Sequence, residues 1–253
     1  MTLDPPPSFK DHFSQVAGAY AAHRPSYPVA LVDFLAQRVP ARRLAWDCGC
    51  GSGQLSVLLA GPFERVVATD ASAEQIARAA AHPKVEYRCA PAGASGLQPG
   101  SADLATAAQA AHWFDLPAYY AEVRRVVRSG GLVALISYGV VSTGPDLDAV
   151  IRPFYEKVLG AYWPPERRHV DEGYRSLPFP FAELETPPFE IRLDWRLEEL
   201  VGYVGTWSAV WALERAQGRG PLTSFTRDLT AAWGPAAAVR TVRWPLALRV
   251  GRR

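Results

Sequence analysis

The fold is decided by residues 44–54, which read Leu44-Ala45-Trp46-Asp47-Cys48-Gly49-Cys50-Gly51-Ser52-Gly53-Gln54. A short apolar strand leads into a turn with three alternating glycines, and a helix-like run follows from Gln54. This order of strand, glycine-rich turn and helix is typical of sites for nucleotide-type cofactors, because glycines let the backbone come close to a ligand. The sequence therefore predicts an α/β fold with a cofactor site at this turn.

The spacing of the glycines separates the candidate cofactors. A dinucleotide site requires G-x-G-x-x-G, and counting from Gly49 and Gly51 places the third glycine at position 54, which is Gln54. A carboxylate at the mouth of the turn, Asp47, would also repel a pyrophosphate and attract a positively charged ligand. Both features disfavour an NAD-linked oxidoreductase and favour S-adenosyl-L-methionine (SAM), which carries an ammonium and a sulfonium group.

A second predicted strand ends in Asp70, about twenty residues past the turn, where a carboxylate would accept hydrogen bonds from both hydroxyls of a ribose. The pattern Asp47-x-Gly49-x-Gly51-x-Gly53 followed by Asp70 resembles the class I SAM-dependent methyltransferases. A closer resemblance, to the methyltransferase type 11 or trans-aconitate methyltransferase-like family, covers roughly residues 9–250. It is carried by residues 24–28, by residues 108–115 and by Tyr138 after the Gly130-Gly131 pair.

The resemblance implies a doubly wound, mostly parallel seven-stranded sheet with an antiparallel C-terminal edge strand and an inserted lid-like helical region. The alternation of strand-like and helix-like runs up to Tyr138 favours such a sheet independently. We expect one methyltransferase domain over residues 1–253. Its expected parts are a SAM-binding core at 9–140, acceptor-side cap elements at 141–188 and 197–238, and closing edge strands at 189–195 and 239–250.

The residues expected to bind SAM come from the turn, from the strand ends and from a helix start marked by the capping box Ser72-x-x-Gln75. In the family a segment that matches residues 9–24 covers the cofactor, although its apolar spacing equally fits a packing helix. Many family members carry an acid where Gly93 stands, so only backbone contact to the adenine is expected there. The full predicted set is Tyr20, Arg24, Asp47, Gly49, Cys50, Gly51, Gln54, Asp70, Ala71, Gln75, Ala90, Pro91, Ala92, Ala108 and Gln109.

The acceptor is expected at the carboxyl end of the fourth predicted strand, since open α/β sheets bind ligands at that edge. The predicted substrate-binding residues are His112, Trp113, Tyr138 and Trp207, with His112 catalytic and Gln109 positioning. The alternatives are a hydrogen-bonded structural His112 and core roles for the two tryptophans.

The chemistry of the acceptor decides what the site needs. A carboxylate is already ionised and requires cationic or donor groups, for which the candidates are Arg24, His112, Trp113 and the pair Tyr174-Arg175. A hydroxyl requires a base, and His112 is then the first candidate.

Composition bounds the partners. A net charge of +2 is too small to indicate nucleic acid. Cys48, Cys50 and Cys89 form no C-x-x-C pair, so we expect neither a metal site nor a disulfide framework. The sequence has no apolar run of membrane-spanning length and no signal-like N-terminus, which predicts a cytoplasmic protein without membrane contact. We expect a monomer or a homodimer.

The favoured function is therefore a SAM-dependent methyltransferase that acts on a small-molecule acceptor. We expect O-methylation of a carboxylate or hydroxyl by in-line displacement. The alternative is a SAM- or adenosine-binding protein without transferase activity, serving as a sensor or partner module. Gly93 permits this alternative, whereas the intact Asp47, Gly51 and Asp70 argue against it.

Overall fold

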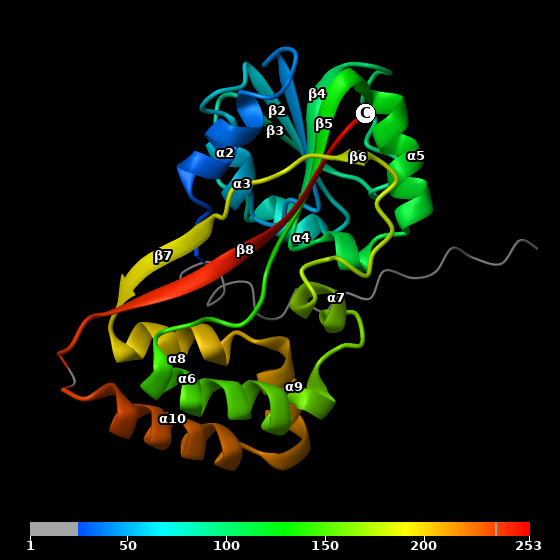
Figure 1. Cartoon of the computed structure of the whole chain (residues 1–253). Helices are drawn as coiled ribbons and strands as arrows, with labels where there is room; N and C mark the ends of the chain where they lie inside the picture. The colour runs from blue at the N-terminus through cyan, green and yellow to red at the C-terminus, as the bar shows by residue number, and fades with distance from the viewer. Residues whose placement is uncertain (1–24, 236) are drawn as a thin grey trace, which may run out of the picture.

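The computed structural model describes residues 25–235 and 237–253. Its strands are β1 (Leu44–Cys48), β2 (Arg65–Asp70), β3 (Val85–Cys89), β4 (Ala102–Ala108), β5 (Val127–Tyr138), β6 (Ala182–Glu183), β7 (Glu190–Trp195) and β8 (Arg240–Arg252). They form a sheet of order β3-β2-β1-β4-β5-β8-β6, with β7 paired to β8 outside this order (Figure 1). All pairings among β1 to β5 are parallel, and every pairing of β8 is antiparallel. The predicted mostly parallel sheet with an antiparallel C-terminal strand is confirmed.

The described sheet has eight strands rather than the predicted seven. The additional strand is β6, whose two residues pair with the last residues of β8. So short a strand has no sequence pattern of its own, because it is defined only by the neighbour that it reaches.

Helices cover both faces of the sheet. The helices are α2 (Val29–Ala36), α3 (Gln54–Leu59), α4 (Ala73–Ala77), α5 (Leu116–Val126), α6 (Pro145–Pro153), α7 (Arg167–Asp171), α8 (Leu197–Gly205), α9 (Ser208–Gln217) and α10 (Gly220–Trp233). Buried side chains of α2 and α3 pack on one face, against Ala45, Val66 and Leu104. Those of α5 pack on the other face, against Trp46 and Val67. Successive strand residues point to opposite faces, so each strand supplies both cores.

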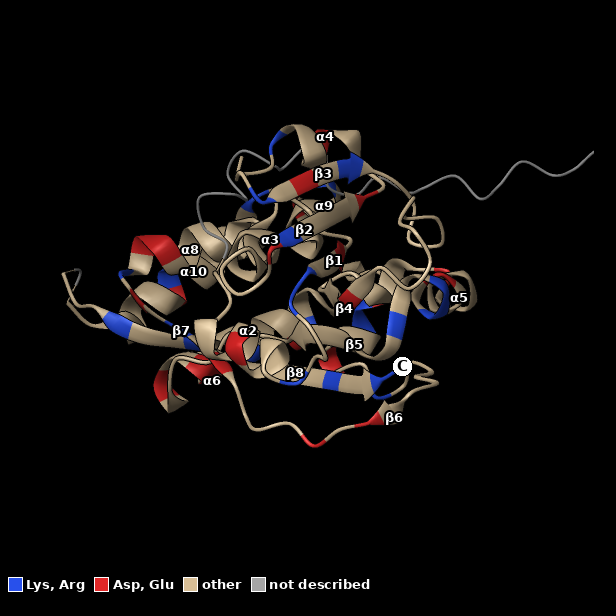
Figure 2. Ribbon diagram, turned by 90° about the horizontal axis from the view of Figure 1, so that it is seen from above, with Lys and Arg blue, Asp and Glu red and all other residues tan. Residues whose placement is uncertain are grey.

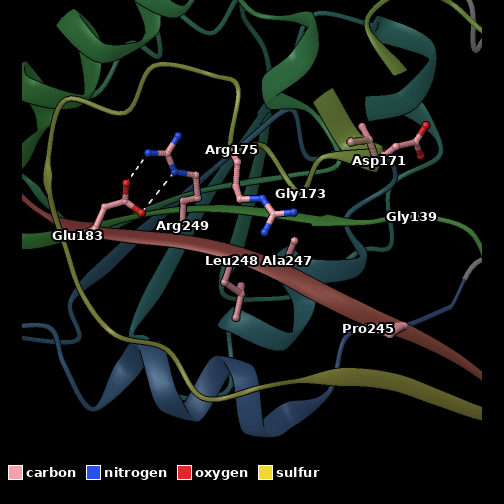
Figure 3. A pocket seen from close by; sticks show the side chains of 10 residues that line it. Gly139, Asp171, Gly173, Arg175, Glu183, Pro245, Ala247, Leu248 and Arg249 are labelled. Carbon is pink, nitrogen blue, oxygen red and sulfur yellow. Dashed lines mark hydrogen bonds and ion pairs between the residues drawn. The ribbon is translucent and has the colours of Figure 1, made fainter. Parts of the chain in front are cut away.

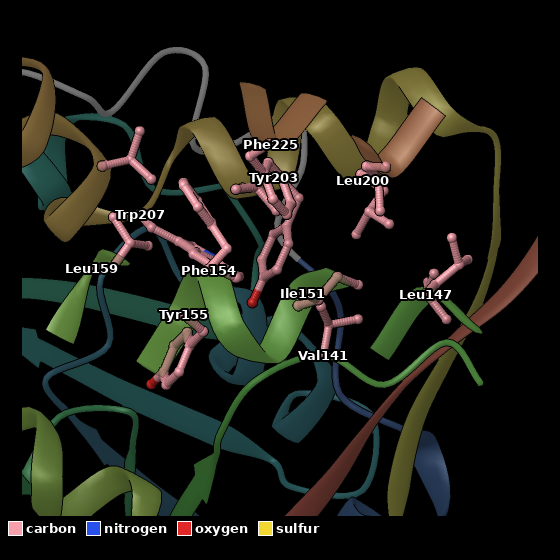
Figure 4. Close-up of a cluster of buried hydrophobic side chains, with 14 of the residues drawn as sticks. Val141, Leu147, Ile151, Phe154, Tyr155, Leu159, Leu200, Tyr203, Trp207 and Phe225 are labelled. Atoms are coloured by element: carbon pink, nitrogen blue, oxygen red, sulfur yellow. The ribbon is translucent and has the colours of Figure 1, made fainter. Parts of the chain in front are cut away.

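Helices α6, α8, α9 and α10 gather below the carboxyl edge of the sheet and form a cap (Figure 1). The cap has its own cluster of buried side chains, in which the Phe154 and Phe225 rings stack at 4.1 Å (Figure 4). Acidic residues lie in the first turns of α6 and α8 (Figure 2), where their negative charge stabilises the helix by interacting with the positive end of its dipole. The cap is thus a second packed layer beside the sheet.

Strand β8 links the cap to the sheet. Its first half pairs with β7, and its second half pairs with β5 from Leu246 onward. Pro245 lies at the change of partner, where its register partner is Glu190. A proline has no N–H for a ladder, so the junction between two pairings is a place where it disturbs little.

Candidate active site

The glycine turn holds a backbone that only glycine adopts readily. Gly49, Gly51 and Gly53 have φ of +69°, +55° and +89°. A Cβ at Gly49 would overlap the Ala110 side chain, and one at Gly53 would overlap the Tyr87 hydroxyl. Glycine is therefore required in this turn by its backbone conformation and, at Gly49 and Gly53, by neighbouring side chains. The turn lies at the carboxyl edge of the sheet, the edge where open α/β sheets bind ligands.

Asp70 ties this turn to the end of β2. One carboxylate oxygen accepts a hydrogen bond from the Gly51 N–H at 2.8 Å, and the other accepts from the Ser72 N–H at 2.9 Å. The Ser72 hydroxyl in turn accepts from the Gln75 N–H at the start of α4, as the predicted cap requires. Each oxygen of Asp70 keeps one further lone pair, so the carboxylate can still accept from the hydroxyls of a ribose.

Asp47 lies beneath the turn. Its side chain is 1% exposed, and its two oxygens accept from the Ser56 hydroxyl at 2.6 Å and the Thr106 hydroxyl at 2.8 Å. Burial raises the pKa of Asp47 to about 6. The two hydroxyl hydrogen bonds lower this pKa, and the charge of Asp70 raises it. Asp47 thus joins β1 to α3 and β4, in addition to any attraction for a cationic ligand.

Gln109 has a strained backbone and a side-chain oxygen without a described hydrogen-bond partner. It has φ of +54°, a left-handed conformation that is uncommon outside glycine. Its side-chain nitrogen donates to the Tyr138 carbonyl at 2.8 Å, while Oε1 is buried and has no hydrogen-bond partner among the residues described. A buried amide oxygen without a donor costs about 1–3 kcal/mol. The ammonium group of SAM would supply donors, so this residue fits the predicted cofactor.

His112 follows Gln109 closely and contacts the segment after α7. Its Nδ1 lies 2.8 Å from the Tyr174 hydroxyl, and its ring centroid is 4.7 Å from that of Trp113. Burial lowers the pKa of His112 to about 3, and the charges of Arg167 and His169 act in the same direction. The imidazole is therefore neutral at physiological pH.

The charge of Arg167 links His112 to two buried tyrosines. It lowers the pKa of His112, and it opposes the burial that raises the pKa values of Tyr174 and Tyr203. Tyr138 was a predicted substrate contact, whereas Arg167 and Tyr203 were missed. The only sequence signal for Arg167 was its position in a stretch rich in prolines and aromatics.

Trp207 is packed among aromatic rings of the cap. It is buried at the start of α9, with its ring 5.4 Å from that of Tyr155 and 5.9 Å from that of Trp163 (Figure 4). Its direct contact with an acceptor remains a prediction, and the packing shows that it supports the two rings beside it.

Most of the other predicted cofactor residues lie at the carboxyl edge of the sheet, around the turn and the strand ends. They are Cys50, Gln54, Ala71, Ala90, Pro91, Ala92 and Ala108. Tyr20 and Arg24 lie outside the described residues. The Cβ that Gly93 lacks would come within 3.0 Å of Ala118 on α5, so a larger residue there would crowd that helix.

The predicted pair Tyr174-Arg175 is divided by the structure. Tyr174 points inward to His112, whereas Arg175 is exposed and lines a cavity of about 540 Å³ on the other side of the segment (Figure 3). Arg249, the other arginine of that cavity, is held by Glu183 and by the Tyr174 and Leu177 carbonyls. Of this pair, Tyr174 contacts His112 and Arg175 does not.

The comparisons agree with this geometry. The family model described as a methyltransferase domain matches residues 46–135. A protein of Dictyostelium discoideum named as a methyltransferase is 33% identical over 232 residues, which cover 90% of this chain and 88% of that protein. A solved structure of a type II methyltransferase from Anaeromyxobacter dehalogenans is 51% identical, with a TM-score of 0.86, and covers 90% of this chain and 97% of that one.

A protein of Saccharomyces cerevisiae named as a probable S-adenosylmethionine-dependent methyltransferase is 29% identical over 46% of this chain and 43% of its own length. Over the described part of the chain, no helix is long and apolar enough to cross a membrane. The glycine turn, the carboxylate at the end of β2 and the two relatives that cover 90% of this chain agree on one identity: the chain belongs to the class I S-adenosylmethionine-dependent methyltransferases, with S-adenosylmethionine as its cofactor.

Proposed function

We propose that the enzyme methylates an ionised carboxylate of a small molecule and forms a methyl ester without a general base. The observation that carries this proposal is the state of His112, the first candidate for a base. A base that takes a proton from a hydroxyl works best with a pKa near the working pH. Burial instead lowers the pKa of His112 to about 3, which makes it a very weak base. A carboxylate acceptor needs no proton removed.

The hydrogen bond of His112 supports the same conclusion. Burial raises the pKa of the Tyr174 phenol, so its oxygen keeps its proton. The backbone N–H groups of Ala111 and His112 oppose this shift as donors toward that oxygen. We therefore assign the Tyr174 proton to the bond with His112 Nδ1, so that Nε2 carries the hydrogen of the neutral ring. An Nε2–H group can donate to an acceptor oxygen and cannot accept a proton from it.

The residues of the chain then act by binding and orientation. SAM supplies an electrophilic methyl group on a sulfonium. The glycine turn and Asp70 bind its adenosine, and Gln109 Oε1 accepts from its ammonium group. His112 holds the acceptor oxygen in line, and the cap excludes water. Such orientation lowers a barrier by up to roughly 7–11 kcal/mol.

The test uses radiolabelled SAM with matched pairs of small acceptors, each a carboxylic acid and the alcohol of the same skeleton. We expect label in the acids only, and in a product that releases methanol in mild alkali, as esters do. Label in the alcohols, in a product stable to alkali, would show a methyl ether and overturn the proposal.

A further inference from the structure

Arg167 is held in place through one of its three nitrogens. Its Nε donates to the Tyr155 hydroxyl oxygen at 2.7 Å and lies 3.3 Å from an oxygen of Asp171. The Tyr155 hydroxyl donates to the same Asp171 oxygen at 2.7 Å. This triangle fixes the direction of the guanidinium group before any ligand binds.

The other two nitrogens are not used in this way. Within residues 25–235 and 237–253, neither Nη1 nor Nη2 of Arg167 makes a hydrogen bond or ion pair. The side chain is only 22% exposed, and its guanidinium carbon lies 5.0 Å from the centre of the Trp163 ring and 5.6 Å from that of Tyr155. A partly desolvated cation therefore keeps the end of its fork open, which is the geometry that receives a carboxylate or phosphate.

The guanidinium group lies where the cap meets the sheet edge. Burial is the largest cause of the low pKa of His112, and the charge of Arg167 lowers this pKa further. The same charge lowers the pKa values of Tyr174 and Tyr203, against the burial that raises them. These three residues come from the end of β4, from the segment after α7 and from α8. Helix α7, which carries Arg167, also contacts the turn of residues 111–113, which carries His112. Arg167 therefore stands beside the proposed acceptor site.

We propose that Arg167 binds, through Nη1 and Nη2, an anionic group of the acceptor other than the carboxylate that is methylated. The inference rests on the proposed function, since His112 is taken to hold the reacting oxygen. A guanidinium on the reacting carboxylate would occupy the lone pairs that attack the methyl group. A second carboxylate or a phosphate on the same molecule lets the cation contribute binding energy without weakening the nucleophile.

The charges around Arg167 permit such a ligand. Asp171 is its one described anionic partner, and that side chain is 40% exposed, so water screens its charge. His112 is neutral, and Tyr155, Tyr174 and Tyr203 keep their protons because burial raises their pKa values. An incoming anion therefore meets the Arg167 cation, and the one described anion near it, the Asp171 carboxylate, is partly screened by water.

The experiment measures binding to the full chain saturated with S-adenosylhomocysteine, which prevents turnover. Calorimetry compares glutarate, its monoamide and 3-phosphonopropionate on wild type, Arg167→Gln and Arg167→Lys. Arg168→Gln is the matched control, because Arg168 is an exposed neighbour on the same helix. Equal S-adenosylhomocysteine affinity in all variants establishes that each is folded.

We expect glutarate or the phosphonate to bind wild type, with the dissociation constant raised about tenfold or more by Arg167→Gln and unchanged by Arg168→Gln. Arg167→Lys should fall between them, because it keeps the charge and loses the fork. The tighter of the two ligands identifies carboxylate or phosphate as the preferred group. Equal binding by both glutamine variants, or no binding of any probe to wild type, would overturn the proposal. Arg167-dependent binding combined with methylation of alcohols alone would instead refute only the carboxylate as the reacting group.

Discussion

The Nδ1 atom of His112 lies 2.8 Å from the Tyr174 hydroxyl oxygen, and this contact joins the end of β4 to the segment after α7. Tyr174 is fully buried and has φ of +61°, a strained conformation for a residue with a side chain. Its carbonyl accepts from Arg249 on β8. The position of His112 is therefore set by a residue that the surrounding fold holds in strain, as is common at active sites.

Removing the hydroxyl alone tests this contact. Tyr174→Phe should reduce kcat by about tenfold, because His112 loses the bond that fixes its ring, while the dissociation constant for SAM stays within about twofold. The matched control is Tyr120→Phe, which removes a buried hydroxyl that donates to the Pro178 carbonyl away from the site. Steady-state kinetics and calorimetry give the two quantities. Equal kcat values for both variants would remove Tyr174 from the site.

The low pKa of His112 predicts the pH dependence of the folded protein. Its pKa in the fold, about 3, lies below the ordinary value of 6.5, so the stability that it contributes is present above pH 6.5 and is lost as pH falls toward 3. Nitrogen NMR, assigned with His112→Gln, should find the ring neutral at pH 5. A protonation midpoint near 6.5 would contradict the proposal and return His112 to the role of base.

Much of the site was predictable because it is local in sequence. The turn, Asp70 and Gln109 each follow directly from a strand end, and parallel strands bring their carboxyl ends to one edge. Arg167 and Tyr203 were not predictable in this way. Tyr203 approaches from the cap and Arg167 from α7, and both helices are placed by contacts between distant segments rather than by any local pattern.

Two local patterns predict a structure that the fold does not adopt. The pair Gly130-Gly131 follows a helical pattern and so predicts a helix end, but both residues lie within β5, where a Cβ on Gly131 would come within 2.8 Å of the Asp103 carbonyl. The apolar spacing over residues 197–214 predicts one helix, but α8 ends at Gly205 and α9 begins at Ser208. Trp207 fills the break, which only its packing in the cap explains.

The glycine turn predicts a contrast between two substitutions. Gly49→Ala adds a Cβ that overlaps Ala110, whereas Gly100→Ala meets no atom within 4 Å at a similar positive φ of +62°. Gly100→Ala should cost only the strain of the backbone, about 1–2 kcal/mol in the free energy of unfolding. Gly49→Ala should cost more and abolish SAM binding. Urea unfolding and calorimetry measure both, and equal losses would show that close approach at Gly49 is unimportant.

Asp70 should affect both the cofactor and the turn. Asp70→Ala is expected to raise the dissociation constant for SAM about tenfold or more, since two ribose hydrogen bonds are lost, or about 1–3 kcal/mol. Adenosine should lose affinity in parallel, because it carries the same ribose. Asp146→Asn, an exposed acid on α6, is the control. Unchanged SAM affinity in a folded Asp70 variant would refute the ribose assignment.

Asp47 predicts a stability that depends on pH. Its pKa in the fold, about 6, lies above the ordinary value of 3.8, so its contribution is fully present below pH 3.8 and is lost as pH rises through 6. The burial of the charged form then costs up to roughly 3 kcal/mol at pH 7. Asp47→Asn carries no such cost, and its amide can bond the Ser56 and Thr106 hydroxyls after they rotate. Unfolding free energies from pH 4 to 7 should therefore shift in favour of the variant.

The same variant separates the two roles of Asp47. If its charge attracts the ammonium and sulfonium of SAM, Asp47→Asn should weaken SAM while adenosine binding changes much less. If Asp47 only holds the turn through Ser56 and Thr106, both ligands should weaken together. Calorimetry at pH 7.5, where the carboxylate is ionised, decides between them. A variant with unaltered affinity for both ligands and no pH-dependent gain in stability would exclude the charge and the scaffold role alike.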